Sequence, residues 1–237
     1  MDKKMETKPK IYFCGDVHGQ FDHLVTLLEA NPPDAIILLG DIQAQRPLHQ
    51  ELAQLNKRIQ VWLIHGNHDT DSDQDYDHLF DSELAQRNLH GRVVDICGIR
   101  VAGLGGVFRS QIWRPPEPPA YESVQAFVRH CGSANRWRGG LPRKHRSSIF
   151  PSDVQALSRQ HADILVTHEA PSFHRFGFAA IEQLASTMRV RQLFHGHQHE
   201  DVQYSAPLGP SPFQAFGVGL RGVMDLDGTV LVPGQID

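Results

Sequence analysis

The feature that most limits the fold of this chain is a series of short apolar runs that alternate with segments of helical spacing. The apolar runs lie at residues 10–15, 34–40, 59–66, 162–168 and 190–196. Segments with helical periodicity lie at 21–30, 47–56, 151–160 and 179–188. Short apolar runs closed by glycine or polar residues are typical of buried strands. The alternation of strand and helix therefore predicts an α/β fold with parallel strands joined by right-handed crossovers.

Composition limits the class of protein further. The 237 residues are 40% hydrophobic and 21% charged, and the net charge of -4 provides no global attraction for nucleic acid. We expect one domain over residues 10–237, a disordered tail over 1–9, and a cap or loop insertion in the Pro- and Arg-rich segment 107–150. No run approaches the roughly 18 apolar residues of a membrane helix. Three cysteines without a paired motif favour a reducing compartment, so we expect a cytoplasmic protein.

Polar clusters follow the predicted strands. They read "GDVHG" at 15–19, "GD" at 40–41, "GNHD" at 66–69, "THEAP" at 167–171 and "GHQHE" at 196–200. Ligands of open α/β sheets bind at the carboxyl ends of the strands. We therefore expect all five clusters to meet at one edge of one sheet and to form a site.

The residue types in these clusters indicate metal chemistry. Asp, Asn and His supply oxygen and imidazole nitrogen, and no thiolate is among them, which suits Mn, Fe or Zn. Two metal ions about 3.5–4 Å apart can stabilise both the attacking and the leaving oxygen of a phosphoryl displacement. Asp41, a lone carboxylate between two other clusters, is a natural bridging ligand.

The ordered set of motifs from Ile11 to His199 resembles the signature of the calcineurin-like metallophosphoesterases. This resemblance implies a four-layer αββα sandwich, with two mixed β-sheets flanked by helices. It also implies a hydrolase with a dinuclear metal site, with manganese as the favoured metal and Fe or Zn as alternatives. The reaction would be in-line attack of a metal-bound hydroxide on a phosphomonoester or phosphodiester.

The resemblance also assigns roles to individual residues. One metal would be held by Asp16, His18, Asp41 and His199, and the second by Asp41, Asn67, His168 and His197. His68 would protonate the leaving oxygen as the general acid. His195 lies before the glycine turn and is expected to pack or to support a ligand rather than to bind metal.

The second motif departs from the protein-phosphatase branch of the family. That branch reads GD-x-x-D-R-G, whereas this chain reads "GDIQAQR" and has Ala44 and Gln45 at the acidic and arginine positions. The residue that normally orients the catalytic histidine is therefore missing. We expect Asp69 to orient His68 in its place.

Several functions stay open. The main expectation is hydrolysis of a phosphorylated small molecule or nucleotide, with Arg143, Lys144, Arg146 and Arg221 as candidate substrate-binding residues. A nuclease or nucleotide phosphodiesterase would use the basic loop 123–152. A serine/threonine protein phosphatase is disfavoured by the second motif. The non-enzymatic alternative is a binding protein on a degenerate phosphoesterase fold, which loss of ligands would favour; here all seven ligand positions are present.

Overall fold

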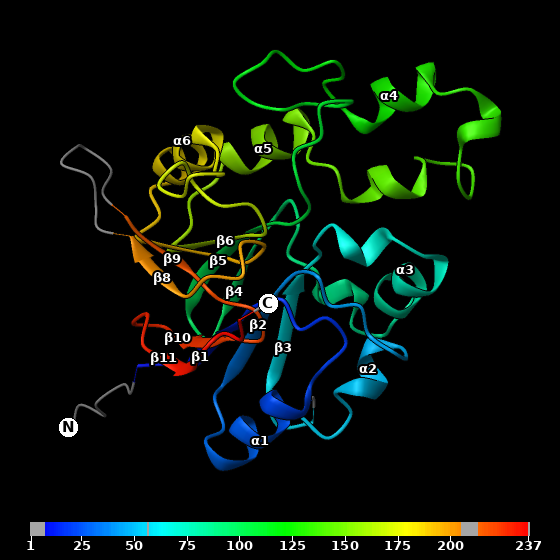
Figure 1. Ribbon diagram of the computed structural model, residues 1–237. Helices are drawn as coiled ribbons and strands as arrows, with labels where there is room; N and C mark the ends of the chain where they lie inside the picture. The colour runs from blue at the N-terminus through cyan, green and yellow to red at the C-terminus, as the bar shows by residue number, and fades with distance from the viewer. Residues whose placement is uncertain (1–7, 56, 205–212, 237) are drawn as a thin grey trace, which may run out of the picture.

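A computed structural model of the chain describes residues 8–55, 57–204 and 213–236 (Figure 1). Of the expected disordered tail at 1–9, residues 1–7 lie outside this description. The described strands form two mixed sheets. The first sheet has the order β11 (Val230–Val232), β10 (Val223–Asp225), β1 (Ile11–Cys14), β2 (Ala35–Leu39) and β3 (Gln60–Ile64). The second has the order β4 (Arg92–Ile96), β5 (Ile99–Leu104), β6 (Ile164–Thr167), β7 (Gln192–His195), β9 (Gln214–Gly217) and β8 (Val202–Tyr204).

The strands that precede the polar motifs are parallel within each sheet. In the first sheet β1 pairs with β2 and β2 with β3, all in parallel register. In the second sheet β5, β6, β7 and β9 form a parallel run. The expectation of one sheet edge is therefore wrong, because the motifs belong to two sheets. The two-sheet sandwich that the resemblance implies is confirmed.

The sandwich is held together by alternate side chains of each strand. Ile11 and Phe13 of β1 face the second sheet, while Tyr12 and Cys14 face the helices on the other side. Phe13 stacks on Phe194 of β7 with ring centroids 3.7 Å apart. Each fully buried side chain of this size contributes about 1.5–3 kcal/mol relative to exposure. The alternation explains why these strands are apolar at consecutive positions.

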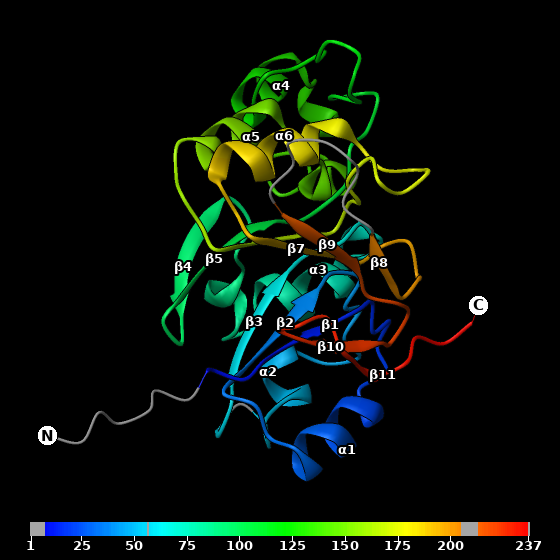
Figure 2. The same ribbon diagram turned by 90° about the vertical axis from the view of Figure 1, so that its left-hand side faces the viewer.

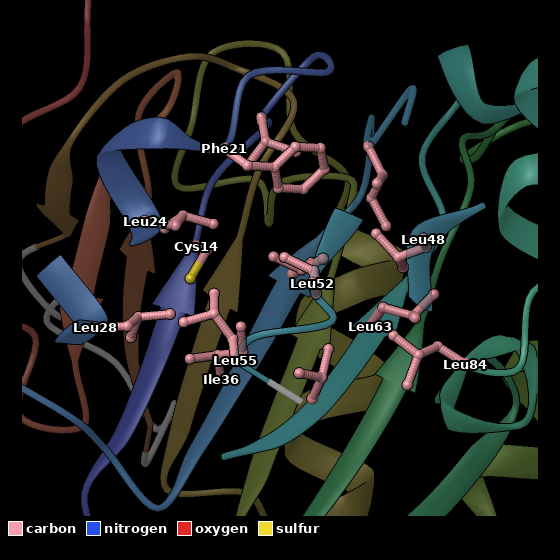
Figure 3. Close-up of a cluster of buried hydrophobic side chains, with 14 of the residues drawn as sticks. Cys14, Phe21, Leu24, Leu28, Ile36, Leu48, Leu52, Leu55, Leu63 and Leu84 are labelled. Carbon is pink, nitrogen blue, oxygen red and sulfur yellow. The ribbon is translucent and has the colours of Figure 1, made fainter. Parts of the chain in front are cut away.

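Helices cover both outer faces and complete four layers (Figure 2). On the first sheet, Leu24 and Leu28 of α1 and Leu48 of α2 pack over Cys14 and neighbouring residues (Figure 3). The second sheet is covered by Leu157 of α5 and by Ile181 and Leu184 of α6. The described α-helices are α1 (Asp22–Ala30), α2 (Leu48–Glu51), α3 (Asp73–Phe80), α4 (Val124–His130), α5 (Pro151–Ser158) and α6 (Ala179–Met188).

The segment 107–150, here called the insertion, leaves the second sheet after β5 and returns at α5. It contains α4 and short 3-10 turns, and it lies above α3 in Figure 1. Its apolar residues Ile112, Leu141 and Phe150 form a small buried cluster of their own. Within the described part of the chain, no helix combines the length and apolar character needed to cross a bilayer.

Candidate metal centre

The seven predicted ligand residues lie together, on loops that follow strands of both sheets. The first sheet supplies Asp16 and His18 after β1, Asp41 after β2 and Asn67 after β3; the second supplies His168 after β6 and His197 and His199 after β7. Six of the seven fall into two groups whose potential ligand atoms lie within 4.8 Å of one another. The groups are Asp16, His18 and His199, and Asp41, His168 and His197.

Each group contains three of the four residues expected around one metal. The first group lacks Asp41, the expected bridging ligand, and the second lacks Asn67. Asn67 lies beside the second group, because its Oδ1 is 3.2 Å from Nε2 of His168. Nε2 of His168 is also 3.3 Å from Oδ2 of Asp41, and its Nδ1 is 3.8 Å from Oδ1 of Asp16. His168 therefore stands between the carboxylates of both groups, so the two groups are neighbours.

Hydrogen bonds between loops hold these side chains in place. Oδ2 of Asp16 accepts the backbone N–H of His197 at 2.7 Å, which joins the β1 loop to the β7 loop. Oδ1 of Asp41 accepts the backbone N–H of His68 at 2.7 Å, which joins the β2 and β3 loops. Each carboxylate thus uses one oxygen to fix a neighbouring loop. The bond from His197 to Asp16 joins the carboxyl ends of the two sheets, and the bond from His68 to Asp41 joins two loops of the first sheet.

The donor atoms fit a metal centre. Asp16 Oδ1 and His18 Nε2 are buried and have no hydrogen-bond partner among the described residues. Such atoms are costly to bury unless something binds them. The ring of His18 is held by Nδ1, which lies 2.6 Å from Oε1 of Gln43, and this leaves Nε2 as the ligand atom. In the same way, Nδ1 of His168 donates to the carbonyl of Leu39 at 2.8 Å.

The electrostatics favour positive charge at the centre. Burial lowers the pKa of His168, but nearby groups have the larger effect and raise this pKa to about 10. These groups are the charged and hydrogen-bonded Asp41, the charged Asp16 and the backbone carbonyl of Leu39. Burial raises the pKa of Asp41, but the charge and hydrogen bond of His168 outweigh burial and shift it below its ordinary value. Burial lowers the pKa of His197 to about 3, so this imidazole is neutral, the form that binds metal. Metal binding would replace the proton of His168 between the two carboxylates.

The backbone of the site adopts conformations that side chains rarely allow. His18, Asp41, Gln43, His197 and His199 all have positive φ, between 42° and 67°. Each non-glycine residue in this region costs on the order of 1 kcal/mol or more, and such residues cluster at functional sites. Two motif glycines permit close approach: a Cβ on Gly66 would lie 2.2 Å from Oδ1 of Asp41, and one on Gly196 would lie 2.4 Å from Oδ1 of Asp16.

His68 begins a short 3-10 helix, His68–Thr70, beside the first group. Its ring centroid is 5.5 Å from that of His18. Its Nδ1 lies 2.5 Å from Oδ2 of Asp71, so the other nitrogen, Nε2, is directed away from this carboxylate. Burial lowers the pKa of His68, but the hydrogen bond to Asp71 and the charges of Asp41 and Asp71 raise it overall.

The expectation that Asp69 orients His68 is therefore wrong. Asp69 is fully buried, and its carboxylate accepts the backbone N–H groups of Ile42, Gln43 and Gly66 at 2.7, 2.9 and 2.8 Å. Its oxygens are used in tying the β2 loop to the β3 loop. Sequence reasoning missed Asp71, although its position three residues after His68 on one helical turn was the available signal.

The predicted substrate-binding residues occupy three different settings. Nε and Nη2 of Arg143 donate to the carbonyls of Thr70 and Asp71 at 3.1 and 2.6 Å, and its Nη1 also pairs with Asp73. Arg146 donates to the Tyr76 hydroxyl at 2.9 Å and lies over the rings of Tyr76 and Trp137. Both arginines therefore fasten the insertion to the segment that carries His68.

Lys144 is exposed, and Arg221 donates to the carbonyl of Val17 and to Gln235. His195 is fully buried in β7, where Nδ1 donates to the carbonyl of Gly196 at 2.8 Å and Nε2 lies 2.9 Å from the Tyr204 hydroxyl. Both of its nitrogens have protein partners, as a packing histidine requires. Substrate binding by Arg143, Lys144, Arg146 and Arg221 stays a prediction.

One curated protein and several solved structures resemble this chain along most of its length, and a second curated protein resembles a shorter part of it. It is 44% identical over 222 residues to an uncharacterized protein of Haemophilus influenzae, which covers 94% of this chain and 96% of that protein. It is 39% identical over 64 residues, 24% of this chain and 22% of the relative, to a symmetrical bis(5'-nucleosyl)-tetraphosphatase of Baumannia cicadellinicola. A crystal structure from Thermus thermophilus shares the fold, with a TM-score of 0.60 and 18% identity over 96% of this chain and 99% of that one. The model of the calcineurin-like phosphoesterases matches residues 9–201. The chain therefore belongs to the calcineurin-like phosphoesterase family.

Proposed function

We propose that the protein hydrolyses a phosphate ester of a small molecule with the help of two bound metal ions. The observation that carries this proposal is the pair of neighbouring Asp/His groups with two buried atoms, Asp16 Oδ1 and His18 Nε2, that lack partners among the described residues. One ion would be held by Asp16, His18, Asp41 and His199, and the other by Asp41, Asn67, His168 and His197. The nitrogen and oxygen donors favour Mn²⁺, with Fe and Zn as the alternatives.

When bound, the metal ions supply charge that neutralises the phosphoryl oxygens and activates a water molecule as the nucleophile. The protein's own contribution to the second half of the reaction is a proton. His68 donates Nδ1–H to Asp71, so its Nε2–H is available to the leaving oxygen. The raised pKa of His68 keeps the ring protonated to higher pH than an isolated imidazole.

Three features support a small phosphorylated substrate over a polyanion or a phosphoprotein. The basic side chains Arg138 and Arg143 of the insertion pair with Asp77 and Asp73 of α3, so their charge is already balanced. The net charge of the chain is -4. At the second motif, the arginine with which protein phosphatases grip phosphate is replaced by Gln45.

The proposal is tested by metal analysis and a substrate screen. Protein stripped with a chelator and reloaded with Mn²⁺ should contain about two ions per chain and hydrolyse phosphomonoesters or small diesters. Asp41→Asn should lower the metal content, because Asp41 is the proposed shared ligand. Full activity with a single ion would contradict the two-metal assignment, and absence of hydrolysis across a broad panel of metabolites, nucleotides and phosphopeptides would contradict the activity itself.

The acid role of His68 needs a second measurement. His68→Ala should reduce kcat by roughly 10²–10⁴ for alkyl phosphates, whose leaving group needs the proton, and much less for 4-nitrophenyl phosphate. His161→Ala is the matched control, because His161 is exposed just after α5. Equal losses for both leaving groups would assign His68 to binding or structure.

A further inference from the structure

A recess lies next to the metal centre and takes no part in the site described above. Its volume is about 630 Å³, which is within the range of pockets for small organic ligands. Two segments far apart in the sequence form it, the start of the insertion at 113–116 and the loop and helix start at 172–183. The residues that carry its chemistry are Trp113, Arg114, Arg175, Phe176 and Phe178.

Aromatic rings and guanidinium groups dominate the lining. Arg114 lies over the ring of Phe178, 5.4 Å from its centroid, and Arg175 lies over the ring of Phe176 at 4.6 Å. Among the described residues that line the recess, none is acidic. Phe176 is 60% exposed, unlike nearly all other large apolar side chains in the described part of the protein. The recess therefore presents ring faces together with positive charge.

The loop that carries Phe176 is held firmly by its own backbone. Pro171 and Phe178 form an isolated bridge, and Phe178 N–H donates to the carbonyl of Ala170 at 2.9 Å. A Cβ on Gly177 would lie 1.8 Å from the carbonyl oxygen of Pro171, so the chain closes tightly there. The N–H of Phe176 donates to Nδ1 of buried His174 at 3.2 Å. The exposed phenyl ring is thus presented by a fixed loop.

Contacts connect the recess to the candidate ligands. Nη2 of Arg175 is 3.8 Å from Oε1 of Glu200, the residue after His199. On the opposite wall, Phe178 packs on Phe108 with ring centroids 4.7 Å apart, and the N–H of Phe108 donates to Glu169, the residue after His168. The recess is therefore one or two side chains away from the site on two sides.

We propose that this recess binds the base of a nucleotide substrate, a planar heteroaromatic ring that stacks on Phe176 beside Arg175. The proposal rests on the proposed phosphoesterase function for its phosphate end, and it narrows the substrate class from phosphate esters to nucleotides. Aromatic side chains and arginine both stack on bases, and every base offers a ring face to them.

Binding to metal-free protein tests the recess independently of catalysis. Adenosine 5'-monophosphate is the probe, ribose 5-phosphate is the matched ligand without the base, and saturation-transfer NMR in the presence of chelator is the measurement. We expect saturation of the adenine ring protons in wild-type protein and its loss in Phe176→Ala. Val230→Ala is the matched control, since Val230 is another exposed apolar residue and lies on β11. Absence of adenine saturation in the wild type, or equal signals in wild type and Phe176→Ala, would overturn the proposal.

Turnover with Mn²⁺ gives a second readout. Phe176→Ala and Arg175→Ala should each lower kcat/KM for adenosine 5'-monophosphate roughly tenfold and leave that for ribose 5-phosphate nearly unchanged, while exposed Arg159→Ala changes neither. Equal losses for both substrates would overturn the base assignment. If the metal-loaded enzyme hydrolyses no compound of the broad panel but adenine saturation depends on Phe176, the proposed function fails and the recess assignment stands.

Discussion

Replacing Asp69 by Asn separates a structural role from a catalytic one. The carboxylate accepts three backbone N–H groups, two on Oδ1 and one on Oδ2. Asparagine can keep the two bonds on its carbonyl oxygen, but its amide nitrogen would face the N–H of buried Gly66. A buried donor left without a partner costs about 1–3 kcal/mol, and a typical hydrogen bond contributes about 0.5–1.5 kcal/mol. We therefore expect Asp69→Asn to lower the free energy of unfolding by about 2–4 kcal/mol.

The loss is large compared with a total stability of about 5–15 kcal/mol for a typical domain. For a chain of this length it corresponds to a fall in Tm of about 5–15 °C. Urea unfolding in the presence of chelator measures it without a contribution from bound metal. The matched control is Asp71→Asn, because the side chain of Asp71 is 54% exposed and its replacement should change stability by less than about 0.5 kcal/mol. An Asp69→Asn protein of normal stability and low activity would refute the structural role.

Three further predictions concern the neighbours of the site. Asp71→Asn should lower the pKa of His68, so activity at high pH is lost at a lower pH than in the wild type; an unchanged basic limb of the kcat profile would count against the His68–Asp71 pair. Burial lowers the pKa of His195 to about 4. As the pH falls below about 6.5, the unfolded chain therefore binds a proton at His195 while the folded protein does not, which lowers the free energy of unfolding. Wild-type protein should lose about 2–3 kcal/mol more than His195→Asn between pH 7 and 4.5 in urea unfolding, and parallel curves would exclude this linkage. Arg143→Ala should lower kcat alike for all substrates because the residue supports the turn after His68, whereas a rise of KM for multiply charged substrates alone would assign it to substrate binding.

The parts of the fold that sequence predicts are those with a clear apolar pattern. The strands β1, β2, β3, β6 and β7 and the helix α6 were expected within a few residues, because each buries a continuous or periodic set of apolar side chains. The helix α3 (Asp73–Phe80) was not expected, since "DQDYDHLF" is mostly polar and its only buried residue is Leu79. Its first turn is capped by the Ser72 side chain. Its acidic residues also pair with Arg138 and Arg143 of the insertion, and sequence periodicity does not show such long-range contacts. The expected helix at 47–56 is reduced to four residues, Leu48–Glu51.

The assignment of sequence to sheet could not come from periodicity. A buried strand has the same apolar pattern in either sheet of a sandwich, because both of its faces are covered. The five motifs therefore looked like one edge of one sheet, whereas β1, β2 and β3 lie in one sheet and β6 and β7 in the other. Only the resemblance to a family supplied the second sheet.

The same limit applies to Asp69 of the "GNHD" motif and Asp71 just after it, two nearby carboxylates with opposite environments. Asp69 and Asp71 are two residues apart. Asp69 is fully buried and accepts three backbone N–H groups, whereas the side chain of Asp71 is about half exposed and bonds to the ring of His68. The difference arises because Asn67, His68 and the following residues adopt helical φ and ψ, so the chain turns about 200–240° between residues 69 and 71 instead of alternating as a strand does. A 3-10 or α turn also brings residues i and i+3 to one face, which places Asp71 under His68. The identity of the orienting acid is therefore set by the helical turn after β3.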